Sequence, residues 1–291
     1  MSHIVQSGIF PKLSLCSQID LYFRNNQFAN LHINDSFFSL DKFGKVSTDT
    51  YFNSLSVGKW KRYTNVNDLI FSIKFKGKIK IIWHLHRLHF SHRLIEEMYF
   101  ENDNISEISF SLTFWKDLED GMLSFDIEAL DYSELYDFYY STRSEILNPV
   151  SMGVVITHFN RQQYVLPALD RLKSELLLDS YFKNKVSLNV VDNSQNLPEI
   201  DGVNIIPNEN LGGSGGFTRG LMHLKENGSY THCLFMDDDA SCEVEGIKRI
   251  ISFLEHALDH KTALAGAMLR EAEMFRQFEN GAKFDGVCKA V

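Results

Sequence analysis

Three consecutive carboxylates, Asp237-Asp238-Asp239, follow the apolar run 233–236. Hard divalent cations such as Mg²⁺ and Mn²⁺ prefer carboxylate, phosphate and water oxygens, so these carboxylates are candidate metal ligands. If the extended backbone continues through Asp238, alternate side chains point the same way, and Asp237 and Asp239 face one site while Asp238 faces another. A run of Asp after a strand is also typical of a solvated turn, so the run alone leaves both interpretations open.

Polar residues follow two earlier apolar runs in the same way. One run is followed by residues 157–161 (THFNR) and the next by residues 192–194 (DNS). In parallel sheets, ligands bind beyond the carboxyl ends of the strands. Asp192 suits the base or ribose of a nucleotide, and Arg161, a planar donor, suits a base or a diphosphate. Each segment alone is more typical of a turn or a surface charge, so the prediction rests on their shared position.

A glycine-rich segment, residues 210–217 (NLGGSGGF), lies between the second and third of these runs. Glycine lets the backbone approach a ligand closely, and the amides at a helix N-terminus attract anionic groups, so the segment suits a diphosphate. The same composition is typical of a flexible linker. The sequence contains neither GxGxxG after the first strand nor GxxxxGK[ST], which argues against dinucleotide-binding and P-loop proteins. The joint order of these segments therefore predicts a nucleotide-sugar site.

The second half of the chain alternates apolar runs with stretches of helical spacing. This order predicts parallel βαβ units, in which the polar segments meet at one edge of the sheet. The expected strands are 154–156, 187–191, 233–236 and 263–269, and the expected helices are 164–178, one opening near Gly216, and 245–258.

The first half instead alternates apolar and polar residues in short runs such as 20–23, 71–75 and 108–112. Runs of period 2 separated by turn residues predict an antiparallel β-sandwich of jelly-roll type. We expect a sandwich domain at 1–130 and an α/β domain at 151–291. A connector, 131–150, lies between them; its Tyr and Leu spacing suits a helix that ends at Pro149.

Four histidines, at positions 84, 86, 89 and 92, invite a metal hypothesis. On an extended strand His84 and His86 share one face while Trp83 and Leu85 share the other. A strand with one solvent-exposed face and one face packed in the core explains this pattern more simply than a metal site does.

Composition limits the function and the compartment. A net charge of −9 over 291 residues opposes broad attraction to nucleic acid or anionic lipid, although it leaves room for a basic local patch. The four cysteines lack ligand spacing, which favours reduced thiols. No signal segment or apolar stretch of about 20 residues is present, so we expect a cytoplasmic protein that does not span a membrane.

Together, residues 154–161, 191–193, 210–217 and 235–239 resemble the family 2 inverting glycosyltransferases of the GT-A fold. The resemblance is to the galactofuranosyltransferase subgroup. It reaches into the first half, where residues 49–55 and 60–64 are similar to part of that subgroup's β-sandwich domain.

The resemblance implies a UDP-galactofuranose donor, a glycan or lipid-linked glycan acceptor, and a role in cell-surface polysaccharide synthesis such as that of O-antigen. It also implies a Mn²⁺ or Mg²⁺ ion held by Asp237 and Asp239. Segments 265–270 and 279–282 resemble the elements where donor and acceptor sugars meet. The implied nucleotide-sugar contacts are Thr157, Phe159, Arg161, Asp192, Asn193, Asn210, Gly212, Gly213, Gly216, Asp237 and Asp238.

In this family the catalytic base and a further metal-site histidine lie well downstream of the Asp run, and the chain ends at Val291. Neither group is assigned to a residue here. We expect a GT-A domain that is incomplete at its C-terminus, with donor binding but poor or no transfer. Peripheral contact with the inner face of the plasma membrane is expected through the region beyond Val291.

Two other functions remain open. The first keeps the fold and uses a different donor, such as a rhamnosyl or pyranosyl nucleotide, because donor choice depends on pocket shape. The second is a non-catalytic carbohydrate-binding or assembly protein, in which the sandwich binds glycan. A nucleotidyltransferase is disfavoured because no glycine- and basic-rich loop follows the first strand.

Overall fold

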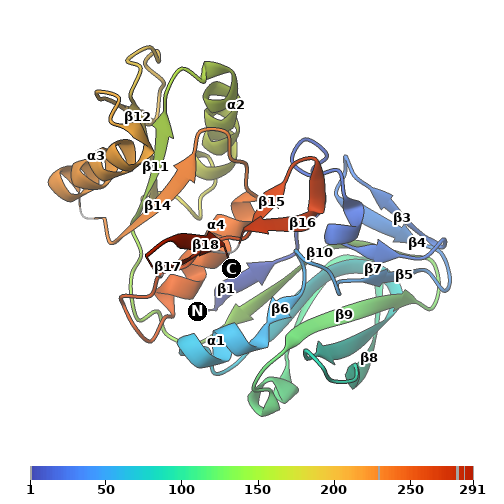
Figure 1. Ribbon diagram of the computed structural model, residues 1–291. Helices are drawn as coiled ribbons and strands as arrows, with labels where there is room; N and C mark the ends of the chain where they lie inside the picture. Colours follow the sequence, from blue (N-terminus) through green and yellow to red (C-terminus); the bar gives the residue numbers. More distant parts are fainter. Residues whose placement is uncertain (1, 229, 280–281, 285, 291) are drawn as a thin grey trace. The chain divides into compact units, whose positions relative to one another are not determined.

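The computed structural model describes residues 2–228, 230–279, 282–284 and 286–290. Its elements fall into two compact units, one formed by Met1–Asn148 with Lys248–Val291 and the other by Pro149–Ile247 (Figure 1). The predicted domain limits at 130 and 150 stay a prediction. Of the segments expected to bring donor and acceptor sugars together, residues 280 and 281 lie outside the described residues.

The first unit is built on a ten-stranded antiparallel sheet in the order β2-β5-β9-β7-β10-β4-β3, with β1 paired to β10, β6 to β9 and β8 to β7. The prediction that the first half is a largely antiparallel β-sandwich is confirmed. Its elements are β1 (His3–Ser7), η1 (Ile19–Leu21), β2 (Arg24–Asn25), β3 (Ala29–His32), β4 (Phe37–Leu40), β5 (Lys45–Ser47), β6 (Leu55–Ser56), α1 (Val57–Tyr63), β7 (Ile70–His86), β8 (Arg93–Ser111), η2 (Thr113–Asp117), β9 (Met122–Ala129) and β10 (Ser133–Thr142).

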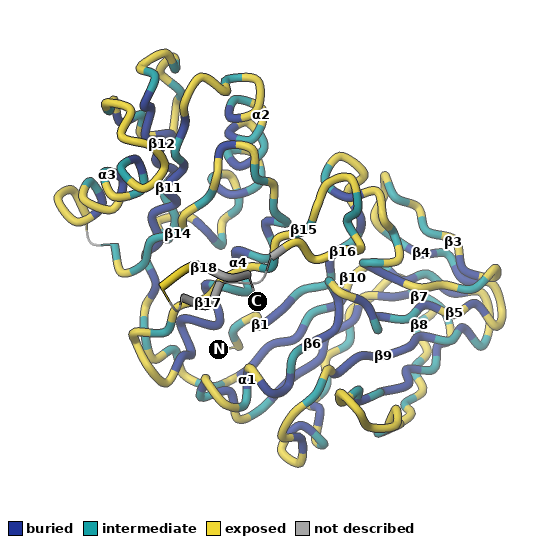
Figure 2. Tube along the Cα trace, in the orientation of Figure 1, coloured by how far each residue is buried: buried dark blue, intermediate teal, exposed yellow. Residues whose placement is uncertain are grey.

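Aromatic side chains fill the core of this unit. The Phe71 ring lies 4.9 Å from the rings of both Trp83 and Phe125, and 5.3 Å from that of Tyr140, measured between centroids. Offset and edge-on aromatic pairs at such distances stabilise beyond their buried area. Strands β7 and β9 are buried along much of their length (Figure 2). The alternation seen in the sequence therefore places these aromatic residues on the inner face.

Three expectations for the first unit are wrong. The segment expected as a connector helix is strand β10, which pairs with β7, β4 and β1. Its apolar residues Leu135, Phe138 and Tyr140 are buried in the sheet, so pairing with distant strands overrides the local helical spacing. The run 20–23 is not a strand, because residues 20 and 21 lie in the short 3-10 helix η1 and residue 22 in a turn. Helix α1 was not expected.

The second unit contains a parallel sheet in the order β13-β12-β11-β14, which confirms the βαβ pattern. Strand β11 therefore lies between β12 and β14. The expected strand 263–269 is mostly wrong, because only a short strand from Met268 forms there and it pairs with the next one in an antiparallel hairpin. Strand β13 was not expected. The elements of this unit are β11 (Met152–His158), α2 (Gln162–Leu172), η3 (Lys173–Leu177), β12 (Val186–Asp192), β13 (Val203–Pro207), α3 (Gly212–Asn227) and β14 (His232–Asp237), with the start of α4 (Val244–Glu255). The rest of α4 and the strands β15 (Met268–Arg270), β16 (Glu273–Glu279), β17 (Ala282–Phe284) and β18 (Cys288–Ala290) belong to the first unit.

Helix α3 packs closely on the parallel sheet because two glycines face it. A Cβ atom at Gly216 would lie 2.3 Å from Thr157 Cγ2, and one at Gly220 would lie 2.3 Å from Val155 Cγ1. One turn further along, Leu224 on the helix covers Gly153 on the strand. The small and large residues thus alternate between helix and sheet, which fixes the register of α3 over β11.

No helix among the described residues is both long and apolar enough to cross a membrane. The cysteines Cys16, Cys233 and Cys242 are free thiols.

We expect Gly220→Ala to destabilise the parallel-sheet unit. The new methyl group overlaps Val155, and this overpacking outweighs the gain in helix propensity, for a net loss of about 1 kcal/mol or more in the free energy of unfolding. All three tryptophans (Trp60, Trp83 and Trp115) lie in the other unit. Urea unfolding should therefore show a lower midpoint by far-UV circular dichroism with an unchanged tryptophan fluorescence transition.

The matched control is Gly246→Ala in α4, where a Cβ atom meets nothing within 4 Å. It should be neutral or stabilising by up to about 1 kcal/mol. If Gly220→Ala and Gly246→Ala unfold alike, the close approach of α3 to the sheet is wrong.

Candidate functional site

The carboxyl ends of three parallel strands meet at one edge of the second unit's sheet. In the register of the sheet, Thr157 on β11 lies opposite Asp237 on β14, and His158 lies opposite Asp192 on β12. The polar segments singled out in the sequence therefore begin side by side, although up to 80 residues of chain separate them.

The three aspartates differ sharply in exposure. Asp238 is 5% exposed, whereas Asp237 and Asp239 are open to solvent. Strand β14 ends at Asp237, and Asp238 and Asp239 form a turn. The extended backbone does not continue through Asp238, so the prediction that Asp237 and Asp239 face one site while Asp238 faces another stays a prediction.

Arg161, which precedes α2, ties this turn to the end of β11. Its Nη1 atom donates to Asp239 Oδ2 at 2.7 Å and to Asp238 Oδ1 at 3.2 Å. The hydrogen bond to Asp238 and the charges of both carboxylates raise the pKa of Arg161 above its ordinary value. Its guanidinium also lies 5.7 Å from the centre of the Tyr164 ring. The arginine is half exposed, so it is held in place and still accessible to a ligand.

His158 was not singled out as a site residue, and it occupies the centre of the network. The side chain is fully buried, with Nδ1 3.4 Å from Asp238 Oδ2 and Nε2 3.3 Å from Asn196 Oδ1. It thereby links the loop after β12 to the Asp turn. The signal in the sequence is a histidine at the end of an apolar strand. Buried polar groups are usually hydrogen-bonded, so a histidine in that position is a candidate for contacts with neighbouring loops.

Asp192 organises its own loop. Oδ1 accepts hydrogen bonds from the Ser194 amide and hydroxyl, both at 3.0 Å, and Oδ2 accepts from the amides of Asn196 and Leu197, both at 2.8 Å. Desolvation acts to raise the pKa of Asp192, but these hydrogen bonds outweigh it and hold the pKa below its ordinary value. The carboxylate is 2% exposed, so the predicted contact with base or ribose stays a prediction.

Asn193 and the start of α3 complete the edge. The Asn193 amide donates to the His158 carbonyl at 2.9 Å, and its side-chain oxygen accepts from Asn208 Nδ2 at 2.8 Å. A Cβ atom at Gly216 would lie 3.1 Å from Asn193 Nδ2, so the glycine allows this side chain to fit beneath the helix.

The glycine-rich segment is the first turn of α3, so the linker interpretation is wrong. Asn210 Oδ1 accepts a hydrogen bond from the Gly212 amide at 3.1 Å, and Gly212 has a positive φ of 73° that suits glycine. Open space surrounds the Cα atoms of Gly212 and Gly213 where a side chain would stand. Phe159, also predicted as a contact, is 46% exposed in the loop after β11.

Asp237 and Asp239 are the predicted ligands of a divalent cation, and this role stays a prediction. Asp237 and Asp239 present accessible carboxylates on either side of a buried one, and the buried Thr157 Oγ1 atom lacks a hydrogen-bond partner. Within the described part of the chain no three His, Cys, Asp or Glu side chains gather as a metal site. Two carboxylates suit a cation that takes its other ligands from phosphate and water, as Mg²⁺ does. Because Arg161 is paired with Asp239, such a cation competes with that ion pair.

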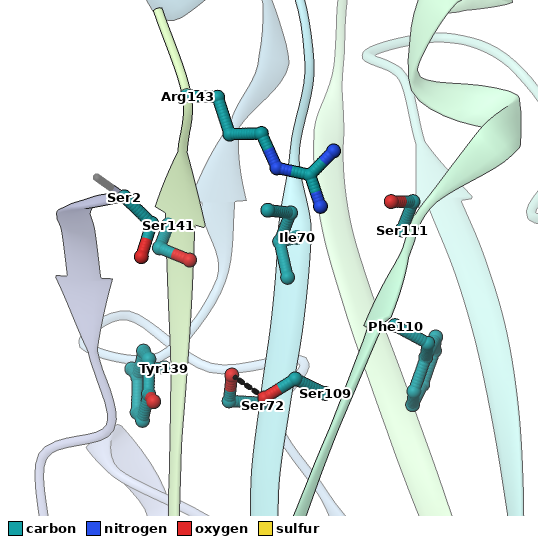
Figure 3. A pocket seen from close by; sticks show the side chains of 9 residues that line it. All are labelled: Ser2, Ile70, Ser72, Ser109, Phe110, Ser111, Tyr139, Ser141 and Arg143. Carbon is teal, nitrogen blue, oxygen red and sulfur yellow. Dashed lines mark hydrogen bonds between the residues drawn. The ribbon is translucent and has the colours of Figure 1, made fainter.

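The described residues form a hollow of about 340 Å³ beside the start of α3. Its lining includes Asn208 and the glycine-rich segment at Leu211 and Gly215 but neither the Asp run nor Arg161. Another hollow, of about 550 Å³, lies on the sandwich and is shown in Figure 3. Its lining is mostly hydroxyl groups with one arginine: Ser2, Ile70, Ser72, Ser109, Phe110, Ser111, Tyr139, Ser141 and Arg143.

The first half of the chain is related to a known protein family. Residues 9–141 match the family described as galactofuranosyltransferase 2 N-terminal. The galactofuranosyltransferase GlfT2 of Mycolicibacterium smegmatis is 23% identical over 221 residues, which cover 72% of this chain and 34% of that protein. GlfT2 of Mycobacterium tuberculosis is 23% identical over 219 residues, with the same coverage. The chain therefore carries a galactofuranosyltransferase-related N-terminal domain and spans about a third of these relatives' length.

Solved structures show only distant likeness. A family 29 carbohydrate-binding module complexed with cellulohexaose is 14% identical, with 49% of this chain and 91% of that chain covered at a TM-score of 0.29. A Clostridium stercorarium carbohydrate-binding module in complex with cellobiose is 10% identical, with 41% and 86% covered at a TM-score of 0.27. At these scores the likeness carries no argument about function.

We expect Asp192→Asn to lower the free energy of unfolding by about 1–3 kcal/mol at pH 7, because loop amides lose a charged acceptor. The folded pKa of Asp192 lies below the unfolded value of about 3.9. Its contribution is therefore fully present above that value and is lost as the pH falls through the folded pKa. Circular dichroism of urea unfolding between pH 7 and 3 should show the two proteins converging below about pH 4.

Asp201→Asn, a change at an exposed carboxylate in the same unit, is the control and should leave stability nearly unchanged. A gap between the wild type and Asp192→Asn that stays constant down to pH 3 would contradict the role of the ionised carboxylate.

Proposed function

We propose that this chain is part of a metal-dependent inverting glycosyltransferase in which the parallel-sheet unit is the nucleotide-sugar half of a GT-A domain. The proposed donor is UDP-galactofuranose, and the proposed acceptor is a glycan or lipid-linked glycan of the cell surface. One observation carries the proposal: Arg161, the Asp237 to Asp239 turn and the N-terminus of α3 all belong to the carboxyl edge of one parallel sheet.

Each group at this edge has a role that its chemistry suits. Asp237 and Asp239 would hold Mn²⁺ or Mg²⁺, which when bound offsets negative charge on the departing diphosphate. Arg161 is a planar, permanently charged donor suited to diphosphate or base. Gly212 and Gly213, at the start of α3, have open space where a side chain would stand, and the partial positive charge of a helix N-terminus suits an anionic group there; the Gly212 amide itself is bonded to Asn210 Oδ1.

Asp238 and His158 have a positioning role in this scheme. Asp238 is buried and accepts a hydrogen bond from Arg161, while His158 lies within 3.4 Å of its other oxygen. Together they fix the turn that presents the two exposed carboxylates. Fixed orientation of charged groups is a large part of catalysis in such sites.

The comparisons support this proposal at a coarse level. The alignment with the mycobacterial enzymes covers 72% of the chain, so it extends past residues 9–141 into the parallel-sheet unit. The enzymes themselves are about three times as long as the aligned segment. We assign no catalytic base to the residues described.

Calorimetric titration with UDP tests the donor site. We expect binding that strengthens when Mn²⁺ is added, and at least about tenfold weaker Mn²⁺-dependent binding in Asp237→Asn/Asp239→Asn. Glu199→Gln/Asp201→Asn removes the same charge from exposed positions in the same unit and is the control. Absence of UDP binding in the wild type, or equal binding in both double variants, would reject the site.

The donor sugar is tested separately by competition. UDP-galactofuranose should displace UDP more effectively than UDP-galactopyranose or a rhamnosyl nucleotide. Equal displacement by all three would leave the nucleotide site intact and reject the choice of sugar.

A second function, glycan binding by the sandwich, is favoured by the hollow in Figure 3. Ser141 is 3% exposed and lines the hollow. Tyr139 adds an aromatic ring and Arg143 a charged donor on the same surface. Hydroxyl groups, an aromatic ring and a planar donor together suit the hydroxyls and apolar faces of sugars.

Tyr139→Ala should therefore weaken saturation-transfer signals from a galactofuranose oligosaccharide, by about tenfold in affinity. Tyr132→Ala, a change at an exposed tyrosine that precedes the same strand and lies outside the lining, is the control. Equal signals from the wild type and Tyr139→Ala would exclude this surface as a glycan site.

A further inference from the structure

The hairpin between β7 and β8 ends in an exposed apolar tip. Leu88 is 82% exposed, Phe90 72% and Leu94 55%. We call these three residues the apolar tip. Burying large apolar side chains is a main source of stability. Neighbouring apolar residues that are this exposed therefore indicate a surface that binds a partner or a membrane.

The tip is an ordered turn. Strand β7 ends at His86 and β8 begins at Arg93, and the Phe90 amide donates to the Arg87 carbonyl at 3.1 Å. At its base the rings of His86 and His92 lie 3.7 Å apart between centroids. The apolar side chains are therefore presented by a defined structure at the end of two long paired strands.

Two arginines, Arg87 and Arg93, flank the apolar tip and are exposed. No carboxylate occurs from position 87 to 94. Neither arginine forms an ion pair with any residue that the structure describes. On the neighbouring turn, the Asp120 carboxylate is already paired with Arg62 at 3.2 Å.

The whole protein carries a net charge of −9, so it is repelled from anionic surfaces except where positive charge is concentrated. A turn with exposed Leu and Phe between cationic residues matches the boundary between lipid headgroups and acyl chains. An anionic lipid surface offers acyl chains for the apolar side chains and negatively charged headgroups for the two arginines.

We propose that the β7–β8 hairpin tip docks this chain on an anionic lipid surface. The apolar tip enters the headgroup boundary while Arg87 and Arg93 contact lipid phosphates. This inference is independent of the donor site, although it suits a lipid-linked acceptor.

The test is co-sedimentation of the full chain with vesicles of phosphatidylcholine alone or with about one third phosphatidylglycerol. We expect binding to the anionic vesicles that weakens with salt. Leu88→Ser/Phe90→Ser should weaken it by about tenfold or more. Arg87→Gln/Arg93→Gln should also weaken it by about tenfold or more and reduce its salt dependence.

The control variant is Leu178→Ser/Phe275→Ser, because these residues are 82% and 72% exposed, the same values as Leu88 and Phe90. It should bind vesicles like the wild type. UDP binding by every variant should match that of the wild type, which separates this inference from the proposed donor site.

A fluorescent reporter gives a second measurement. The native tryptophans are at most 5% exposed, so Phe90→Trp adds an accessible one. Its emission should shift to shorter wavelength with anionic vesicles and be quenched by brominated lipid, while native emission stays unchanged.

Several results would overturn the inference. These are no vesicle binding by the wild type, equal losses in Leu88→Ser/Phe90→Ser and Leu178→Ser/Phe275→Ser, or an unquenched Phe90→Trp reporter. If light scattering instead shows a wild-type oligomer that Leu88→Ser/Phe90→Ser dissociates, with no vesicle binding, the tip contacts a second copy of the chain and the lipid proposal is wrong.

Discussion

The ion pairs between Arg161 and the carboxylates after β14 hold the candidate site together. A carboxylate as buried as Asp238 requires partners, because an unpaired buried charge is costly. Arg161 supplies a hydrogen bond from a different strand end, and His158 Nδ1 lies 3.4 Å from the other carboxylate oxygen. The exposed carboxylates on either side are therefore oriented by the buried one between them, and the site depends on an ion pair in which Asp238 is buried while Arg161 is half exposed.

The sheet makes this interaction possible. Strand β11 lies between β12 and β14, so the residues after it can contact both neighbours. His158 uses this central position to reach Asn196 on one side and Asp238 on the other. The close packing of α3, which depends on Gly216 and Gly220, brings a helix N-terminus to the same unit without displacing Asn193.

Much of this arrangement could be predicted from the sequence. Period-2 runs and the alternation of strands and helices identified the antiparallel and parallel sheets, because local apolar spacing reflects which face is buried. Residue 157 and residues 192 and 237 were correctly expected at strand ends. Strand β10 was missed because its spacing suits a helix in isolation, and only pairing with β7 makes it extended.

Side-chain partners could not be read from spacing. Asp192 was expected to face a nucleotide, but its four hydrogen bonds come from residues two to five positions ahead, as is typical when Asp closes a loop. His158 carries no sequence signal that distinguishes a linker between two loops from a packed core residue. Strand order places groups at an edge, whereas hydrogen-bond geometry decides which of them remain available. By that criterion Asp237, Asp239 and Arg161 are the residues at this edge with accessible charge for a diphosphate and its cation.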